Sequence, residues 1–130
     1  AKETTQGFLH SHSYTGNPLA CRAALATLDL FASRNQIIQN QQLATLFNHY
    51  FAPIAQHPRV RHFRHRGMIW AFDWQDAPAS RTIFSAALAQ GVLLRPIGNT
   101  VYLIPPYIIE EEHMQQVARV LLHLLNTLSC

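Results

Sequence analysis

Hydrophobic residues recur three and four positions apart, the spacing of a helix face, in four stretches of the chain. The first, residues 17–33, is apolar on almost every side, so the helix it predicts is either buried on several sides or waiting for a partner. Residues 35–55 are amphipathic, although Pro53 weakens the last turn of their helix. Shorter helices are expected at 80–90, with Gly91 as the stop, and at 110–127.

Alternation of polar and apolar residues predicts strands between these helices. Residues 60–74 alternate and are rich in β-formers, and Gly67 interrupts them, so we expect two short strands or one bent strand. Further short strands are expected at 92–94 and 100–104, joined by the turn-forming residues 96–99. Helices that cover a small, mainly antiparallel sheet make a two-layer domain, α/β in class and α+β in arrangement.

The start of the first helix carries a second signal. Asn17 is a good N-cap, Pro18 suits the first turn, and Gly16 permits a tight turn before them. Three hydroxyl residues precede this helix start: Ser11, Ser13 and Thr15. A helix N-terminus presents free amides and partial positive charge, so the loop is a candidate anion cradle, with phosphate as the natural guest. The alternative is an ordinary capped helix with a polar entry loop.

Length and composition favour one domain, part of whose surface is covered by another part of an assembly. The chain has 130 residues, 48% of them hydrophobic, but only 13% charged, about half the usual ~25%. A surface poor in charge is expected where another part of an assembly covers it, although a surface rich in His, Gln and Asn would have the same composition. Because the chain begins at Ala1 without an initiator methionine, we expect a fragment.

Charge and cysteine usage exclude some classes. The formal net charge of +3 is too small to imply nucleic acid. Cys21 and Cys130 do not make a disulfide framework and read as thiols of a reducing compartment. With no signal peptide and no apolar run near the ~20 residues of a membrane span, we expect a cytoplasmic protein that binds no membrane.

Three groups of residues are candidates for chemistry. Arg95 ends a predicted strand in apolar company, where it either binds a carboxylate with its planar fork or bonds nearby carbonyls or a glutamate of the last helix. The basic run 59–66 could contact phosphates, or it is a strand edge protected by charge. The short histidine pairs, His10 with His12 and His62 with His65, lack the second half of a zinc site, so no metal is expected.

Two motifs resemble a known family. The run 8–21, with its core His-x-x-x-Tyr-Thr-Gly-Asn-Pro-Leu-Ala-Cys, resembles the segment of class III, pyridoxal-phosphate-dependent aminotransferases that carries the phosphate-binding hydroxyl across the dimer interface. The run 94–109, Leu-Arg-Pro-Ile-Gly-Asn-Thr-Val-Tyr-Leu-Ile-Pro-Pro-Tyr-Ile-Ile, resembles one branch of it, the adenosylmethionine-8-amino-7-oxononanoate aminotransferases. Two motifs in the right order are a specific signal.

The resemblance assigns roles to single positions. Ser13 occupies the place of the serine or threonine that binds the cofactor phosphate of the neighbouring subunit, and His12 precedes it with a backbone contact. Ser11 falls beside the substrate. Arg95 occupies the place of the arginine that holds the carboxylate of the keto-acid substrate, and Tyr102 follows it where it would line the substrate channel. No residue of the chain takes a catalytic role.

The resemblance also implies a fold and an activity. The fold is the small C-terminal domain of a fold-type I enzyme, with a connecting segment at 1–16 and the domain at 17–130. The parent enzyme would convert 8-amino-7-oxononanoate to 7,8-diaminononanoate in biotin biosynthesis, as a homodimer with pyridoxal 5'-phosphate and with adenosylmethionine as amino donor. The only lysine, Lys2, is not at the Schiff-base position, so the isolated chain should be inactive.

Two alternatives to this activity stay open. One is another class III ω-aminotransferase. The other is a small binding module that uses the His/Arg-rich strand 59–66 on an acidic or nucleic-acid partner.

Overall fold

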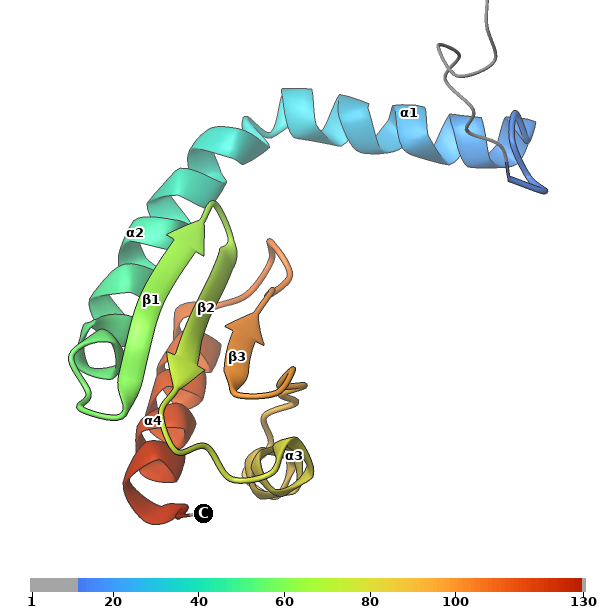
Figure 1. Cartoon of the computed structure of the whole chain (residues 1–130). Helices are drawn as coiled ribbons and strands as arrows, with labels where there is room; N and C mark the ends of the chain where they lie inside the picture. Colours follow the sequence, from blue (N-terminus) through green and yellow to red (C-terminus); the bar gives the residue numbers. More distant parts are fainter. Residues whose placement is uncertain (1–11, 130) are drawn as a thin grey trace, which may run out of the picture. The chain divides into compact units, whose positions relative to one another are not determined.

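The computed structural model of the chain describes residues 12–129 (Figure 1). Packing divides the chain into two compact units, Ala1–Ile37 and Ile38–Cys130. The predicted boundary between a connecting segment 1–16 and a domain 17–130 stays a prediction. Within the described residues, none of the helices is long and apolar enough to cross a bilayer.

The first unit holds a polar loop and helix α1 (Pro18–Ser33). The Asn17 side chain accepts a hydrogen bond from the Ala20 N–H at 3.1 Å and Pro18 lies in the first turn, so the predicted helix start is confirmed. Within its own unit, no α1 residue is buried, and Leu19 is 81% exposed. The two predicted situations for this apolar helix, burial on several sides or a missing partner, both stay predictions.

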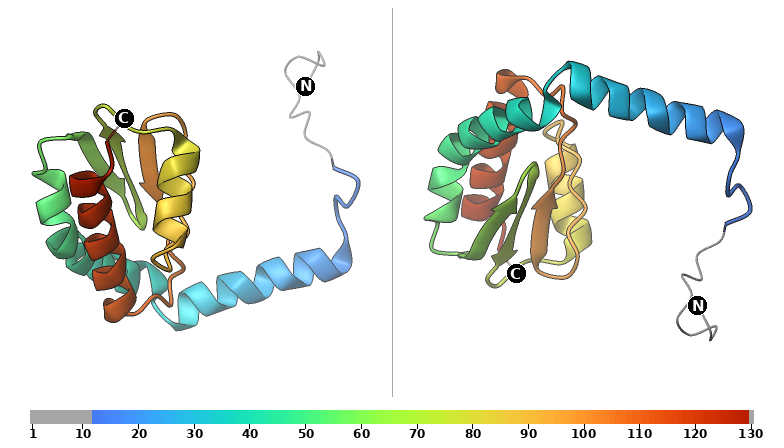
Figure 2. Two further views of the ribbon diagram at one scale, coloured as in Figure 1. Left: turned by 90° about the horizontal axis from the view of Figure 1, so that it is seen from below. Right: turned by 90° about the horizontal axis from the view of Figure 1, so that it is seen from above.

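The second unit is built on a three-stranded antiparallel sheet in the order β1-β2-β3. The strands are β1 (Val60–Arg66), β2 (Ile69–Trp74) and β3 (Thr100–Leu103). The helices are α2 (Gln36–Ala55), whose first two residues belong to the first unit, α3 (Ser80–Leu88) and α4 (Glu111–Thr127). Figure 2 shows α2 and α4 side by side over one face of the sheet, and Gln115 on α4 donates to the Tyr50 hydroxyl on α2 at 3.1 Å. The predicted two-layer α/β arrangement is confirmed.

The stretch 60–74 forms a hairpin, so the first of the two predicted forms is correct. Gly67 lies in the turn with a φ of 53°, a left-handed conformation that glycine adopts without steric cost. The sequence did not predict that the β1–β2 register shifts between Arg61 and Arg64, where His62 also has a positive φ of 50°. This irregularity turns the His62 side chain toward β2 and is typical of a β-bulge.

The side chain of Asp73 on β2 contacts residues of both neighbouring strands. Its carboxylate lies 2.9 Å from Nδ1 of His62 on β1 and accepts a hydrogen bond from the Thr100 hydroxyl on β3 at 2.8 Å. The His62 contact, followed by the Thr100 bond and the charge of Arg64, lowers the pKa of Asp73 from its ordinary value. The single side chain of Asp73 therefore joins the bulge in β1 to the start of β3.

The predicted strand at 92–94 is wrong. Val92 and Leu94 are buried and Leu93 and Arg95 are exposed, which is the alternation of a strand, but this segment pairs with none of the described strands. The Val92 N–H instead donates to the Ala87 carbonyl at the end of α3. The sheet ends at β3, so the burial of alternate side chains holds the segment extended without a ladder of hydrogen bonds.

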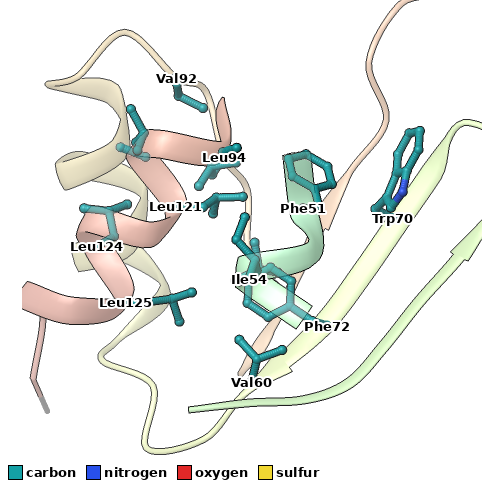
Figure 3. Packing of buried hydrophobic residues seen from close by; sticks show 14 of the residues in the cluster. Phe51, Ile54, Val60, Trp70, Phe72, Val92, Leu94, Leu121, Leu124 and Leu125 are labelled. Atoms are coloured by element: carbon teal, nitrogen blue, oxygen red, sulfur yellow. The ribbon is translucent and has the colours of Figure 1, made fainter. Parts of the chain in front are cut away.

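The core lies between the sheet and the helices (Figure 3). Trp70 on β2 packs against Phe47 and Phe51 of α2, with ring centroids 4.7 and 5.9 Å apart. Leu121, Leu124 and Leu125 of α4 complete it together with Val92 and Leu94. The segment that carries Arg95 is thus anchored in the core by its apolar residues.

The two buried tryptophans of β2 allow a matched test of indole hydrogen bonding. Trp70 donates from Nε1 to the Asn48 side-chain oxygen at 2.8 Å, whereas Nε1 of the equally buried Trp74 has no partner among residues 12–129. We expect Trp70→Phe to lower the free energy of unfolding by about 1 kcal/mol more than Trp74→Phe, because only the first removes an indole hydrogen bond, the one to the half-buried Asn48 oxygen. Urea unfolding followed by circular dichroism measures the difference, and equal losses would contradict the assignment.

Candidate functional site

A pocket of about 380 Å³ opens in the second unit where the chain after α3 and after β3 passes over α4. Its lining is mainly apolar and includes the two positions singled out by the second motif, Arg95 and Tyr102. The other lining residues are Phe47, Gly91, Val92, Leu93, Leu103, Ile104, Pro105, Pro106, Ile109, His113, Gln116 and Val117. An apolar pocket with a few polar groups is the usual form of a small-molecule site.

Arg95 gives this pocket a permanent positive charge. It is exposed, and its guanidinium makes no hydrogen bond or ion pair with any residue from 12 to 129. The alternative role, in which it bonds nearby carbonyls or a glutamate of the last helix, therefore does not occur within the described chain. A guanidinium beside apolar walls offers two parallel donors to a carboxylate. The roles of Arg95 and Tyr102 stay predictions, but the structure brings both to one pocket.

Hydrogen bonds of the residues that follow Arg95 in the chain hold its segment next to the sheet. Ile97 and Thr100 exchange backbone hydrogen bonds of 2.9 and 3.0 Å across a tight turn. Within that turn, the Ser80 hydroxyl at the start of α3 donates to the Gly98 carbonyl at 3.0 Å. The predicted turn at 96–99 thus connects the Arg95 segment directly to β3.

The loop before α1 carries the phosphate-binding prediction. The His12 N–H donates to the Thr15 hydroxyl at 2.8 Å, and the Thr15 N–H donates to the His12 carbonyl at 2.9 Å. These bonds close the loop and engage Thr15 within it. The exposed Ser13 hydroxyl has no hydrogen-bonding partner in the part of the chain that the structure describes. Ser13 is thus available to a phosphate next to a helix N-terminus; the predicted substrate contact of Ser11 lies outside the described residues.

The basic run 59–66 is mostly engaged by its own chain. Arg59 donates to carbonyls of Leu125, Leu128 and Asp76. Arg61 donates to the carbonyls of Pro58 and Val60. Arg64 donates to the His62 carbonyl and lies 3.4 Å from Asp73. Because three of the four arginines are bonded within the chain, the run is better explained as a charge-protected edge strand than as a binding surface.

Of the two short histidine pairs, only His62 with His65 lies within the described residues, and its members contact different partners. His62 contacts Asp73 and His65 contacts Asn48, while His10 lies outside the described residues. Among described residues, one group could hold an ion: Glu110, Glu112 and His113, all exposed at the start of α4. Exposed acidic residues at a helix N-terminus are common because they complement the helix dipole, so we assign no metal to them.

Sequence reasoning missed two polar residues of the pocket. His113 and Gln116 come from α4, and the sequence placed them only on a helix without stating what they face. Their spacing of three residues put them on one side of the helix, which was the available signal. Which side faced the pocket depended on the packing of α4.

Comparisons with known proteins agree with the two motifs. The family profile described as Aminotransferase class-III matches residues 2–125. Adenosylmethionine-8-amino-7-oxononanoate aminotransferase of Helicobacter pylori is 41% identical over 97% of this chain and 30% of its own length. The crystal structure of the enzyme of that name from Methanocaldococcus jannaschii is 30% identical, with a TM-score of 0.80 over 96% of this chain and 31% of that one.

A further solved structure bears on the cofactor. An amine transaminase from an uncultivated Pseudomonas species, solved in its pyridoxal-phosphate-bound form, is 26% identical with a TM-score of 0.74, covering 89% of this chain and 30% of that one. The chain spans about 30% of the length of the curated relatives it matches.

Proposed function

The chain belongs to the class-III aminotransferases, and from that premise we propose that the whole protein transfers an amino group to 8-amino-7-oxononanoate. The product is 7,8-diaminononanoate, an intermediate of biotin biosynthesis, and adenosylmethionine is the amino donor. The whole protein works in the cytoplasm as a homodimer. The second motif, which resembles the branch that carries this name, and the relatives of the same name support the choice of substrate over other ω-aminotransferase substrates.

One observation carries the proposal: an arginine with no partner among residues 12–129 lies in a mainly apolar pocket. The proposed acceptor has a carboxylate at one end of a hydrocarbon chain and its reacting ketone near the other end. Arg95 suits the carboxylate because a guanidinium bonds both oxygens at once, and the apolar walls suit the methylene groups. Holding the far end of the chain orients the ketone for reaction, which lowers the entropic part of the barrier.

The cofactor would be held partly by the first motif. The Ser13 hydroxyl, which has no partner among residues 12–129, lies before the α1 N-terminus and fits a phosphate group. The His12 N–H donates to the Thr15 hydroxyl, so a backbone contact of His12 with the phosphate would replace that bond. Pyridoxal phosphate supplies the electron sink that amino-group transfer requires. Lys2 is the only lysine of the 130 residues, so the Schiff-base lysine is expected from the remaining part of the whole protein. In the homodimer, Ser13 serves the cofactor of the neighbouring subunit.

The test is made on the full-length gene product. We expect it to bind pyridoxal phosphate with a visible absorbance band that adenosylmethionine bleaches, and to form 7,8-diaminononanoate, detected by mass spectrometry. The 130-residue chain, assayed as the control, should show neither. No band in the full-length protein would contradict the aminotransferase proposal. A band with turnover of simple ketones but not of 8-amino-7-oxononanoate would favour another ω-aminotransferase.

A further inference from the structure

The position of Arg95 depends on a segment that lies outside the sheet. Residues 92–96 pair with none of the described strands, so no ladder of hydrogen bonds fixes their backbone. The far end is held by the Ile97–Thr100 pair. The near end bonds to α3, through the Gly91 N–H to the Leu88 carbonyl and the Val92 N–H to the Ala87 carbonyl, and a side chain of α4 adds a further contact there.

The Gln116 side chain of α4 lies against both residues at this near end, Gln90 and Gly91. Its Nε2 donates to the Gln90 carbonyl at 3.2 Å. A Cβ added to Gly91 would lie 3.1 Å from the same nitrogen, a tight contact that the Gln116 side chain would have to relieve by shifting slightly. Gly91 also has a φ of 77°, which other residues rarely adopt. Gly91 and Gln116 both line the pocket of Arg95.

We propose that Gln116 is a positioning residue for Arg95: its bond to the Gln90 carbonyl fixes the start of segment 92–96 on α4 and thereby the place of the guanidinium in the pocket. This rests on the proposed function in one respect, the binding of a substrate carboxylate by Arg95. Two parallel hydrogen bonds to a carboxylate require the guanidinium in one orientation, and displacement by about 1 Å is enough to weaken such a site.

The neighbouring glutamine provides a matched control. Gln115 donates to the Tyr50 hydroxyl at 3.1 Å and to Glu111 at 3.3 Å, so it joins α4 to α2 and does not line the pocket. Gln116→Met and Gln115→Met each remove one side-chain amide from the same helix with little change in volume or helix propensity. Both should lose some stability, and only the first should affect Arg95.

The first measurement needs no ligand. In the 130-residue chain labelled with ¹⁵N, the backbone order parameters of Leu94 and Arg95 should fall from about 0.85 toward 0.6 in Gln116→Met and stay unchanged in Gln115→Met. Gly91→Ala, which crowds the same nitrogen, should act like Gln116→Met. Equal order parameters in the two methionine variants would overturn the proposal.

The second measurement uses heptanoate, a straight-chain carboxylate, as the probe. The Arg95 Nε–Hε signal of the wild-type chain should shift on titration, and Gln116→Met should weaken the apparent affinity about fivefold while Gln115→Met leaves it within twofold. Loss of binding in Arg95→Ala with unchanged binding in Gln116→Met would overturn the positioning role and leave the carboxylate site standing. An unmoved Arg95 signal in the wild-type chain would instead count against the carboxylate site, with the order parameters still deciding on Gln116.

Discussion

Replacing Arg95 with alanine in the full-length gene product should lower kcat/KM for 8-amino-7-oxononanoate by about a hundred- to a thousandfold, or ~3–4 kcal/mol. The guanidinium has no partner among residues 12–129, so the substitution breaks no bond within this part of the fold. The loss is that of a bidentate pair between the arginine and the substrate carboxylate. The cofactor absorbance band should be unchanged, because Arg95 is assigned to substrate and not to phosphate.

Two further variants complete the test: one separates the charge of Arg95 from its geometry, and the other is a control outside the pocket. Arg95→Lys keeps the charge but not the planar fork, so we expect an intermediate loss. Arg119→Ala removes an exposed arginine of α4 that does not line the pocket, and its kcat/KM should remain within about twofold of the wild-type value. Steady-state kinetics with the acceptor as varied substrate measure all three. If Arg95→Ala behaves like Arg119→Ala, Arg95 does not hold the acceptor.

Replacing Arg59 with methionine should lower the free energy of unfolding of the 130-residue chain by about 3 kcal/mol. Nη1 of Arg59 donates to the carbonyls of Leu125 and Leu128 at the end of α4, and Nη2 donates to the Asp76 carbonyl at 2.9 Å. The guanidinium also lies 5.3 Å from the centre of the Trp74 ring. The last carbonyls of a helix have no partner within it, so the variant would leave two of them, those of Leu125 and Leu128, without this donor.

Arg66→Met is the control for this prediction. Arg66 is the last residue of β1, the strand that follows Arg59; it is exposed, and its side chain makes no hydrogen bond or ion pair with the described residues. Its replacement should change the free energy of unfolding by less than about 0.5 kcal/mol. Urea unfolding at constant ionic strength, followed by far-ultraviolet circular dichroism, compares the two. A loss below about 1 kcal/mol in Arg59→Met would mean that water replaces the guanidinium at these carbonyls.

Signals that act between near neighbours in the chain were sufficient to predict most elements of the fold. The Asn17-Pro18 pair placed the start of α1 because the cap bonds an amide three residues later. Gly67 and Gly91 placed a turn and a helix stop, and both have the positive φ that such positions require. The two motifs identified the family and selected Arg95 and Ser13 as candidate site residues, a choice that no hydrogen bond within the described chain opposes.

Interactions between residues far apart in the chain could not be predicted in this way. Residues 92–94 have the alternation of a strand, but a strand needs a neighbour in the sheet, and the described sheet ends at β3. Arg59 read as part of a basic run, yet its acceptors on Leu125 and Leu128 lie 66 and 69 residues further along the chain.

The sequence by itself determined the helices, the strand-forming stretch 60–74, the family and the candidate chemistry of Arg95, because periodicity, caps, turns and motifs are local properties. Tertiary structure alone decided which arginine of the basic run stabilises the fold and which segment remains outside the sheet. It also decided that Gln116 of α4 lies against Gly91 beside the Arg95 pocket. The physical reason is the same in each case: these contacts exist only after the helices have packed on the sheet, and no local pattern records which side chains that packing brings together.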